Sequence, residues 1–410
     1  MSASSQSILV IAGLAAGIVV GALIGSFGGP ALQDVAQMIR PVGELWLSAL
    51  QMTVIPLVIA LLITGVASAS DTASNGRLAA RTLFLFLALL GLAALISAVV
   101  MPLALTLWPV DPDASAALRA GVGAAAQPPA AAALGDWFKN IIPTNPFKAA
   151  AEGAILPLVV FALFFGLAAA TLKTETRAPL LGFFQAVAET MLTIVKWVLW
   201  VAPLGVFALA INVGLQGGVA AAGGITQYVI MMCGIGALIT LAAYLVVALF
   251  SKMSVVKFAR AAVPAQAVGF STQSSLVSLP AMLTAANVSL GLSPRVSGIV
   301  LPLAVSVFRM TSPAVNLAIV LFVAHVYGVE IGMSQLIVGW AVAVVTSLAV
   351  VGLPSALTFF TTTVPISMAM GVPIQLLTLL VAVEVIPDLF RTLGNVTADL
   401  AAATIVGSRE

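Results

Sequence analysis

The sequence VEVIPDLFRTLGNVTADLAAATIV, residues 383–406, interrupts a strongly apolar region with a regular series of polar side chains. The series advances in steps of four, three, four and four residues and consists of Glu384, Asp388, Arg391, Asn395 and Asp399. This spacing predicts that the five side chains lie on one face of a helix. Each charge costs roughly 2.5–3.5 kcal/mol at the centre of a bilayer, so this face must contact protein or water. We interpret it as a functional site; the alternative is an internal salt bridge between Asp388 and Arg391 that only holds helices together.

The composition around this series is that of a membrane protein. Of the 410 residues, 61% are hydrophobic and only 7% are charged, whereas soluble domains carry about 25% charged residues. The net charge of +2 provides no basic surface for nucleic acid. The single Cys233 excludes a disulfide within the chain and a cysteine-based metal site. The chain is therefore expected to lie in a lipid bilayer.

Apolar runs long enough to cross a bilayer fill the first part of the chain. About 20 residues span the hydrocarbon, and such runs occupy roughly residues 8–27, 44–69, 82–108, 153–172, 194–213 and 226–251. Basic residues at alternate ends of these runs place the amino terminus in the cytoplasm. We expect scaffold helices 1 and 2 in residues 1–72. Helix 3, an extracytoplasmic loop and the helix 4 region follow in 73–180, and helices 5 and 6 in 181–255.

From residue 256 to residue 410 the apolar pieces become shorter and occur in pairs. Pieces of about 12 to 15 residues flank two polar tips, STQSS (271–275) and GLPSA (352–356). A helix of this length is too short to cross the membrane alone, so each pair is interpreted as a re-entrant hairpin. The order hairpin 1, helix 7, hairpin 2, helix 8 predicts a transport core with its site between interrupted segments. The alternative is two pairs of kinked helices.

The charged series suits a zwitterionic ligand that has an additional carboxylate. Asp388 could bind an ammonium group, and Arg391 could bind a carboxylate through two parallel hydrogen bonds. Asn395 and the serines of the first tip could bind the α-carboxylate, together with backbone N–H groups at the starts of half-helices. These residue types therefore favour an acidic amino acid as the ligand.

Four stretches of this chain match the signatures of a known family. They are LSALQMTVIPLVIALLITGVAS (47–68), IIPTNPFKAAAEGAILPLVVFALFFGLA (141–168), APLGVFAL (202–209) and FRTLGNVTADL (390–400). In these stretches, and nearly end to end, the sequence resembles the glutamate transporter family, the dicarboxylate/amino acid:cation symporters. The resemblance implies an all-α integral membrane protein with eight transmembrane helices and two re-entrant helical hairpins. It also implies a homotrimer in the inner (plasma) membrane, in which each transport core moves like an elevator.

The resemblance also assigns roles to individual positions. Asp388 is expected to bind the amino group of the substrate, Arg391 its side-chain carboxylate, and Thr392 and Asn395 are expected to complete the pocket. The other matching positions are Gln273, Ser274 and Ser275 in the first tip, Ser312 in helix 7, and Leu353 in the gating second tip. In the family, an arginine at the position of Arg391 accompanies acidic substrates, which favours aspartate, glutamate or a related dicarboxylate.

Helix 7 departs from the family where the family binds sodium. The family motif is Asn-Met-Asp-Gly-Thr, whereas this chain has Phe308, Arg309, Met310, Thr311 and Ser312. Sodium needs oxygen ligands, and the side chains of Phe and Met have none, although Asp399 matches a sodium ligand of the family. An arginine gained and an aspartate lost change the local charge by two, so we expect Arg309 to replace bound sodium. The alternative is that Arg309 snorkels or pairs without affecting coupling.

The coupling hypothesis follows from the charges of the site. The net formal charge of the site is 2 − 3 = −1, from two arginines (Arg309 and Arg391) and three acids (Glu384, Asp388 and Asp399). An acidic substrate adds another negative charge. Low-dielectric surroundings disfavour the charged form of a carboxyl group, so the three acids are candidates to carry protons. We expect a sodium-independent transporter that is proton-coupled or exchanges substrates, without a cofactor or bound metal. The alternative is a sodium-coupled symporter of the same family for another substrate, such as cystine or a neutral amino acid.

Two other classes of protein fit the sequence less well. A membrane hydrolase would pair Ser271, Ser274 or Ser275 with His325, because a serine nucleophile needs a base. His325 is the single histidine and lies well beyond the break in helix 7, so an enzyme is not expected. An ion channel would account for charges within the membrane, but not for paired hairpins beside a series suited to an amino acid.

Overall fold

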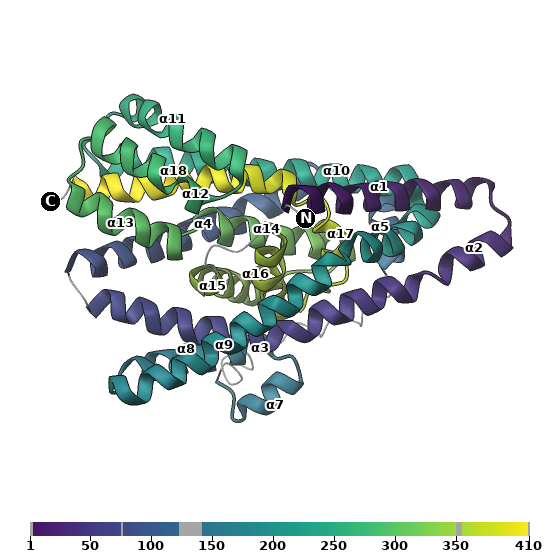
Figure 1. The fold of residues 1–410 in the computed structure, drawn as a ribbon. Helices are drawn as coiled ribbons and strands as arrows, with labels where there is room; N and C mark the ends of the chain where they lie inside the picture. The colour runs from purple at the N-terminus through teal and green to yellow at the C-terminus, as the bar shows by residue number, and fades with distance from the viewer. Residues whose placement is uncertain (1–2, 75–76, 123–141, 350–354, 409–410) are drawn as a thin grey trace.

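Every element that the structure describes is a helix. The structure is a computed structural model and describes residues 3–74, 77–122, 142–349 and 355–408. In these ranges the helices pack into an elongated bundle (Figure 1). The expected all-α class is confirmed for this part of the chain.

The amino-terminal part combines long helices with short ones. The long helices are α1 (Ala3–Phe27), α3 (Arg40–Ser74), α4 (Arg77–Leu107), α9 (Thr174–Trp200) and α10 (Ala202–Phe250). The short helices are α2 (Pro30–Gln37), α5 (Pro112–Val122), α7 (Pro146–Ala151) and α8 (Ile155–Ala170). Within α10, Gly218 has a φ of 38° and marks a kink, a conformation that glycine adopts without a steric penalty.

Six stretches of the described chain are long and apolar enough to cross a membrane. They are Ile8–Phe27, Pro30–Ala67, Leu78–Leu107, Thr174–Trp200, Ala220–Phe250 and Pro294–Tyr327. The predicted run 194–213 differs, because α9 ends at Trp200 and α10 begins at Ala202. Pro203 stands at the start of α10, where its missing N–H and fixed φ favour a new helix over continuation of the old one.

Helix α1 packs against α10 through a seam of glycines, and the two helices run side by side (Figure 1). The seam has a spacing of four residues and consists of Gly13, Gly17, Gly21 and Gly25. A Cβ atom added to Gly17 would lie 2.6 Å from the Cβ of Ala210. Small residues at this spacing let two helix backbones approach closely within a membrane. The packing here therefore requires glycine.

Two helices form the first predicted hairpin. Helix α11 (Val255–Thr272) ends at Gln273, whose φ of 53° reverses the chain, and α12 (Ser275–Thr284) begins two residues later. Ser274 caps α12, because its hydroxyl accepts a hydrogen bond from the N–H of Val277 at 3.3 Å. A π-helical turn, Ala285–Ser289, continues α12. Both helices pack against the last helix of the chain (Figure 1).

The remaining helices contain the break and the second pair. They are α13 (Pro294–Val307), α14 (Thr311–Tyr327), α15 (Met333–Ala349), α16 (Ser355–Met370), α17 (Leu377–Leu380) and α18 (Val385–Gly407). The interruption expected at residues 308–313 is shorter in the structure: Phe308, Arg309 and Met310 separate α13 from α14, and Pro313 lies in the first turn of α14, where proline is tolerated. Helices α15 and α16 pack on each other, but most of the second tip, Leu353 included, lies outside the described residues.

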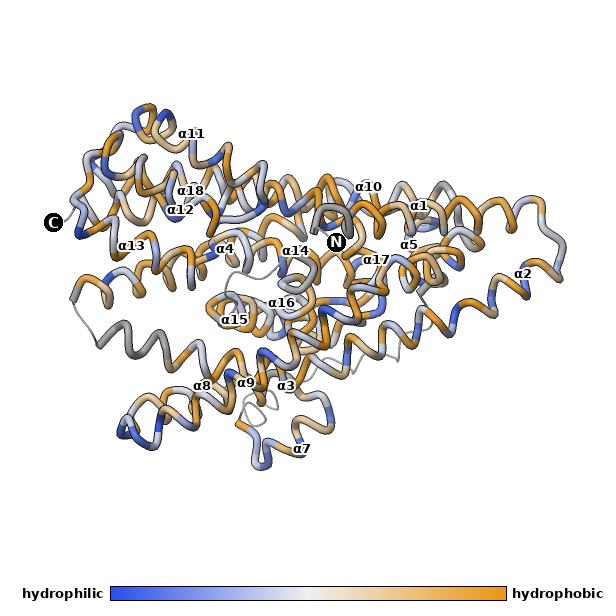
Figure 2. Tube along the Cα trace, viewed as in Figure 1, coloured by the Kyte–Doolittle hydropathy of each residue, from blue (hydrophilic) through white to orange (hydrophobic). Residues whose placement is uncertain are grey.

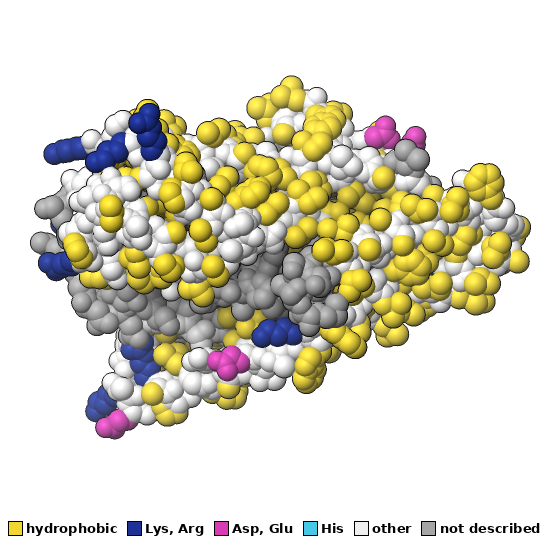
Figure 3. Space-filling view, turned by 45° about the horizontal axis from the view of Figure 1, so that its top comes forward, with side chains coloured by type: hydrophobic (Ala, Val, Ile, Leu, Met, Phe, Trp, Pro, Cys, Tyr) yellow, Lys and Arg dark blue, Asp and Glu magenta, His cyan; other side chains and the backbone are white. Residues whose placement is uncertain are grey.

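The core of the molecule surrounds α14, whose residues 311–324 are all buried. Hydrophobic residues cover most of the helices, whereas hydrophilic ones gather at turns such as the one between α8 and α9 (Figure 2). Lys and Arg side chains gather at one end of the visible face (Figure 3). The exposed Lys252 lies in the turn between α10 and α11, and the exposed Lys257 and Arg260 lie at the start of α11. This distribution agrees with helices that end at a membrane surface.

Candidate functional site

The polar series at the end of the chain lies against protein. Glu384 is 1% exposed, Arg391 4% and Asp399 0%; Asn395 is also buried, and Asp388 is half-buried. Helix α18 begins at Val385, so Glu384 stands at its N-cap, whereas the spacing predicts it on the helix itself. The series therefore faces the interior, but its first member belongs to the turn that precedes the helix.

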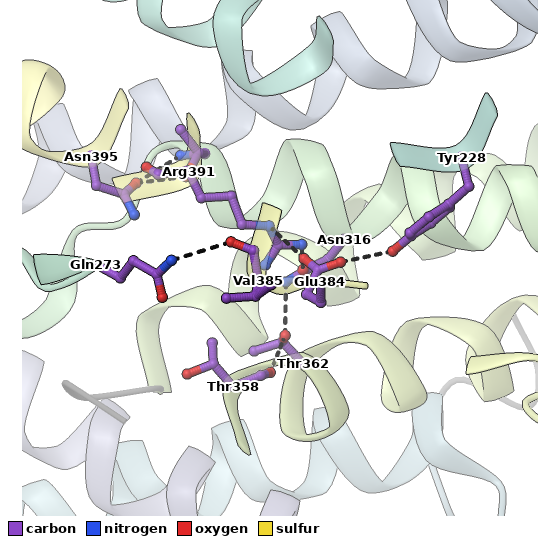
Figure 4. A network of polar contacts seen from close by, with 10 residues as sticks. Tyr228, Gln273, Asn316, Thr358, Thr362, Glu384, Val385, Arg391 and Asn395 are labelled. Carbon is purple, nitrogen blue, oxygen red and sulfur yellow. Dashed lines mark hydrogen bonds and ion pairs between the residues drawn. The ribbon is translucent and has the colours of Figure 1, made fainter. Parts of the chain in front are cut away.

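The ion pair that the structure gives to Arg391 is with Glu384. Arg391 Nε lies 3.1 Å from Glu384 Oε1, and the Tyr228 hydroxyl donates a 2.8 Å hydrogen bond to Glu384 Oε2 (Figure 4). Arg391 Nη2 donates a 2.7 Å hydrogen bond to Asn316 Oδ1. The amide nitrogen of Asn316 donates to Thr362 Oγ1 at 2.8 Å. Arg391 is thus held by side chains from α10, α14 and the start of α18.

Asn395 joins α18 to the broken helix. Its Oδ1 accepts a hydrogen bond from the backbone N–H of Thr311 at 3.0 Å and lies 2.8 Å from the Thr311 hydroxyl. The same hydroxyl lies 3.1 Å from the carbonyl oxygen of Arg391. The first N–H groups of a helix lack intrahelical partners, so Asn395 caps α14 from a neighbouring helix. Asn395 was expected from the sequence to bind the substrate. In the structure its amide oxygen caps α14.

The first tip meets the start of α18. Gln273 Nε2 donates a hydrogen bond to the carbonyl oxygen of Val385 at 3.3 Å, close to the pair of Arg391 and Glu384 (Figure 4). Ser274 is used as the cap of α12, and Ser275 is buried. The tip residues that the sequence singled out therefore come together with the charged series.

The other predicted substrate residues lie close by. Ser312 is buried in the first turn of α14, and Thr392 is buried on α18 next to Gly269 of α11. Leu353 is outside the described residues. Apart from Leu353, the predicted substrate-binding residues come from α18, the start of α14 and the first tip, and helices α11, α12 and α14 each pack against α18.

Arg309 lies in the break, close enough to two acids of α18 to interact with their charges. Its charge interacts with those of Asp388 and Asp399. Arg309 Nε and both carboxylate oxygens of Asp399 are buried, and within the described chain none of the three atoms has a hydrogen-bond partner. Phe308 and Met310, on either side of Arg309, are 1% exposed and supply no side-chain oxygen. The break therefore holds a guanidinium whose charge acts on Asp399, while Phe308 and Met310 supply no oxygen ligand.

Among the residues the structure describes, no group of three or more His, Cys, Asp and Glu side chains is arranged to hold a metal ion. Cys233 is a free, half-buried thiol on α10. His325 is on α14, in the last turn, and Ser274 and Ser275 are near the start of α18, so the geometry gives no support to a serine hydrolase.

Sequence reasoning missed four residues of this site, namely Tyr228, Thr311, Asn316 and Thr362. Each is a polar side chain in a strongly apolar helix, and Tyr228 and Asn316 are fully buried. Buried polar side chains inside a membrane are expected to pair with one another. That signal was present in the sequence, but it does not specify which partner each residue takes.

Buried charges, a broken helix and a hairpin tip that meet inside a bundle of membrane-spanning helices define a membrane transporter. The model of the sodium:dicarboxylate symporter family matches residues 7–409. The chain belongs to this family, whose members are transporters and not enzymes. A proton/sodium-glutamate symport protein of Bacillus caldotenax is 28% identical, over 98% of this chain and 93% of that protein.

Other relatives differ in their substrates. The proton/glutamate-aspartate symporter of Escherichia coli (strain K12) is 25% identical, over 92% of this chain and 86% of that protein. The human neutral amino acid transporter B(0) is 30% identical, over 97% of this chain and 78% of that protein. The family is therefore settled by the comparisons, whereas the choice of substrate has to be argued from the residues of the site.

Proposed function

We propose that this protein is a secondary active transporter of acidic amino acids or dicarboxylates, of the aspartate or glutamate class. The observation that carries the proposal is the buried guanidinium of Arg391, which already neighbours a carboxylate. A guanidinium binds a carboxylate through two parallel hydrogen bonds. Asp388, half-buried three residues earlier on α18, is placed to bind the amino group of an amino acid. Thr392, Asn395, Ser312 and the first tip complete the proposed pocket, with Leu353 in the second tip.

We further propose that transport is independent of sodium. Arg309 stands in the break of helix 7 and interacts with Asp388 and Asp399, so its charge neutralises acids that would otherwise attract a cation. The flanking side chains of Phe308 and Met310 provide no oxygen ligands for sodium. In this proposal Arg309 is a permanent positive charge at the place where relatives bind mobile ions.

Protons or substrate exchange provide the driving force in this proposal. The site has two guanidinium groups and three carboxyl groups, a formal charge of 2 − 3 = −1. Bringing a further negative charge into a low-dielectric site favours uptake of a proton. Glu384, Asp388 and Asp399 are the candidate carriers.

We propose that the protein is a homotrimer in the inner (plasma) membrane. In each protomer the transport core is proposed to move across the membrane by an elevator mechanism. The pairs α11/α12 and α15/α16, with α13, α14 and α18 between and after them, supply the elements of such a transport core. The remaining helices, α1 and α3 above all, are proposed to form the scaffold.

Uptake of radiolabelled aspartate into proteoliposomes tests the proposal when sodium and pH are set independently on the two sides. We expect saturable uptake that an inward proton gradient or internal substrate accelerates and that replacement of sodium by choline leaves unchanged. A steep dependence on the sodium gradient would contradict sodium independence. A thermal-shift screen of acidic amino acids and dicarboxylates across pH, with and without sodium, identifies the preferred substrate.

A second candidate is a sodium-coupled symporter for a neutral amino acid or cystine. It is favoured by the relative that is named a neutral amino acid transporter. The buried Arg391 argues against this candidate, because a substrate with a neutral side chain offers no carboxylate to this guanidinium, and Glu384 would remain its ion-pair partner. Stabilisation by alanine or serine in sodium, without stabilisation by aspartate, would support this candidate.

A further inference from the structure

Arg391 is held by two different kinds of contact. Its Nη2 donates a well-formed 2.7 Å hydrogen bond to Asn316, which Thr362 fixes in turn. Its Nε lies 3.1 Å from Glu384 Oε1, yet neither of these buried atoms has a hydrogen-bond partner among the described residues. The contact with Glu384 is therefore an ion pair without an aligned hydrogen bond.

This difference leaves the Nε–H group of Arg391 open to competition. Arg–carboxylate pairs are strongest when two parallel N–H···O bonds form in the plane of the guanidinium. Glu384 does not reach that geometry at Nε. A carboxylate that approaches Nε in the plane gains a hydrogen bond that Glu384 does not make there, while Asn316 stays bonded to Nη2, which carries a second N–H group.

Tyr228 gives Glu384 a partner that does not depend on its charge. The Tyr228 hydroxyl donates to Glu384 Oε2 at 2.8 Å, and its ring packs edge-on against Phe322 with centroids 5.4 Å apart. A phenol oxygen both donates and accepts hydrogen bonds. Glu384 can therefore stay bonded to Tyr228 as a carboxylate or as a carboxylic acid, whereas Arg391 attracts only the carboxylate.

Other charged groups also face Glu384. Asp388 acts on it from α18, and the Cys233 thiol interacts with it from α10, the helix of Tyr228. Arg309 acts on Arg391 from the break between α13 and α14. Helices α14 and α16 present the neutral side chains of Asn316 and Thr362. Arg391 is thus the positive charge nearest to Glu384 in the described structure, and Asp388 a second negative one.

We propose that Glu384 is the resident counter-ion of Arg391 and takes up the coupled proton when a substrate carboxylate replaces it there. This inference rests on the proposed acidic substrate and selects one carrier from three candidates. The proton comes from solvent and ends on a Glu384 carboxylate oxygen, and Tyr228 retains the neutral acid. The guanidinium of Arg391 is then paired with one ionised carboxylate at a time, Glu384 before binding and the substrate after it, as a low-dielectric site favours. Glu384 and Tyr228 act on the substrate through Arg391 and are positioning residues.

The sign of the pH dependence follows from this exchange. Where Glu384 is ionised before binding, each substrate molecule must bind together with one proton. The affinity for an acidic substrate then falls as pH rises, by about tenfold per pH unit. A neutral side chain at position 384 removes the competition and the proton, so affinity becomes high and independent of pH.

Calorimetry with L-aspartate as the probe tests the inference on the purified full-length protein between about pH 5.5 and about pH 8.5. In wild type we expect the falling affinity and uptake of about one proton per aspartate, measured in two buffers that differ in ionisation enthalpy. Glu384→Gln keeps an oxygen for Tyr228 and is expected to show a flat profile and no proton uptake. The exposed Glu330, between α14 and α15, gives the matched control Glu330→Gln, which is expected to behave as wild type.

Tyr228→Phe supplies a second variant that retains the packing on Phe322. Tyr228 can bond both forms of Glu384, but a hydrogen bond to an ionised carboxylate is the stronger one. Loss of the hydroxyl therefore disfavours ionised Glu384, so the pH above which aspartate affinity falls is expected to move upward. A tyrosine with only a structural role would lower the melting temperature and leave this pH profile unchanged. If Glu384→Gln yields no folded protein, an unshifted profile in Tyr228→Phe overturns the inference.

The outcomes separate this inference from the proposed function. Wild-type protein that binds a neutral amino acid but neither aspartate nor succinate overturns both. Wild-type protein that binds aspartate, with Glu384→Gln keeping the wild-type slope and proton uptake, overturns the inference alone and leaves Asp388 or Asp399 as the carrier. Folded Glu384→Gln protein that no longer binds aspartate also overturns it, because a competitor cannot be required for binding.

Discussion

Phe308, the first residue of the break between α13 and α14, stacks face to face on Phe86 of α4. The ring centroids are 4.3 Å apart and the ring planes are inclined by 8°, and both side chains are buried. Stacking anchors the backbone directly before Arg309 to a neighbouring helix. The direction of the Arg309 side chain therefore depends on a residue more than 200 positions away in the sequence.

Phe86→Ala is expected to destabilise the protein and to impair transport. Removing a buried phenylalanine costs about 3–5 kcal/mol, and the break loses the ring on which Phe308 rests. Thermal unfolding in nanodiscs and aspartate uptake measure the two effects. Phe84, on the same helix, is 75% exposed, so Phe84→Ala is the matched control and should leave both nearly unchanged. Equal effects of the two substitutions would contradict the assigned role of the stack.

The glycine seam between α1 and α10 predicts opposite effects of one substitution at two sites. A Cβ at position 17 would lie 2.6 Å from Ala210, whereas a Cβ at Gly234 would have nothing within 4 Å. Gly17→Ala is expected to lower the melting temperature, because the helices must separate. Gly234→Ala is expected to raise stability by about 0.5–1 kcal/mol through helix propensity. A higher melting temperature for Gly17→Ala would show that α1 does not pack as described.

Much of the fold follows from the sequence because lipid restricts the backbone to helices. The apolar runs near 8–27 and 82–108 match Ile8–Phe27 and Leu78–Leu107 in the structure. The tip at Gln273 was expected from polar residues inside apolar pieces, and a break was expected at residues 308–313, of which the structure keeps only Phe308–Met310 outside the helices. The separation of α9 from α10 was not expected. A single apolar residue, Val201, separates the two helices. Because this residue does not lower the local hydropathy, Pro203 is the one sign of the break in the sequence.

The site was predictable along one helix but not between helices. The spacing of Arg391, Asn395 and Asp399 places them on one buried face, as found. Periodicity does not show that Arg391 pairs with Glu384 and not with Asp388. It also cannot supply Asn316, 75 positions from Arg391, or Tyr228, 156 positions from Glu384. These partners are set by how α10, α14 and α18 pack together.

Arg391→Ala is expected to abolish binding of acidic substrates. Loss of a charged hydrogen-bonding partner for a buried carboxylate costs about 3–5 kcal/mol, which corresponds to more than a hundredfold in affinity. Calorimetry with aspartate measures the change. Arg295→Ala removes an exposed arginine at the start of α13 and should leave affinity unaltered. Unchanged aspartate affinity in Arg391→Ala would refute the assigned pocket.

Arg309→Ala is expected to make the protein respond to sodium. In wild type the guanidinium faces Asp399, whose two carboxylate oxygens are buried and, within the described chain, without hydrogen-bond partners. Removing the positive charge leaves a buried carboxylate uncompensated, at a cost of about 3–5 kcal/mol. A sodium ion can then offset that charge, because it binds carboxylate oxygen. We therefore expect sodium, compared with choline, to raise the melting temperature of Arg309→Ala but not that of wild type.

The double variant Arg309→Ala/Asp399→Asn separates this explanation from a general loss of packing. Removing the carboxylate as well should restore part of the lost stability and abolish the effect of sodium, because no uncompensated charge remains. A loss due to packing alone would persist in the double variant, since both variants lack the same arginine side chain. Sodium-dependent stabilisation of the wild-type protein would contradict the view that Arg309 occupies the role of the ion.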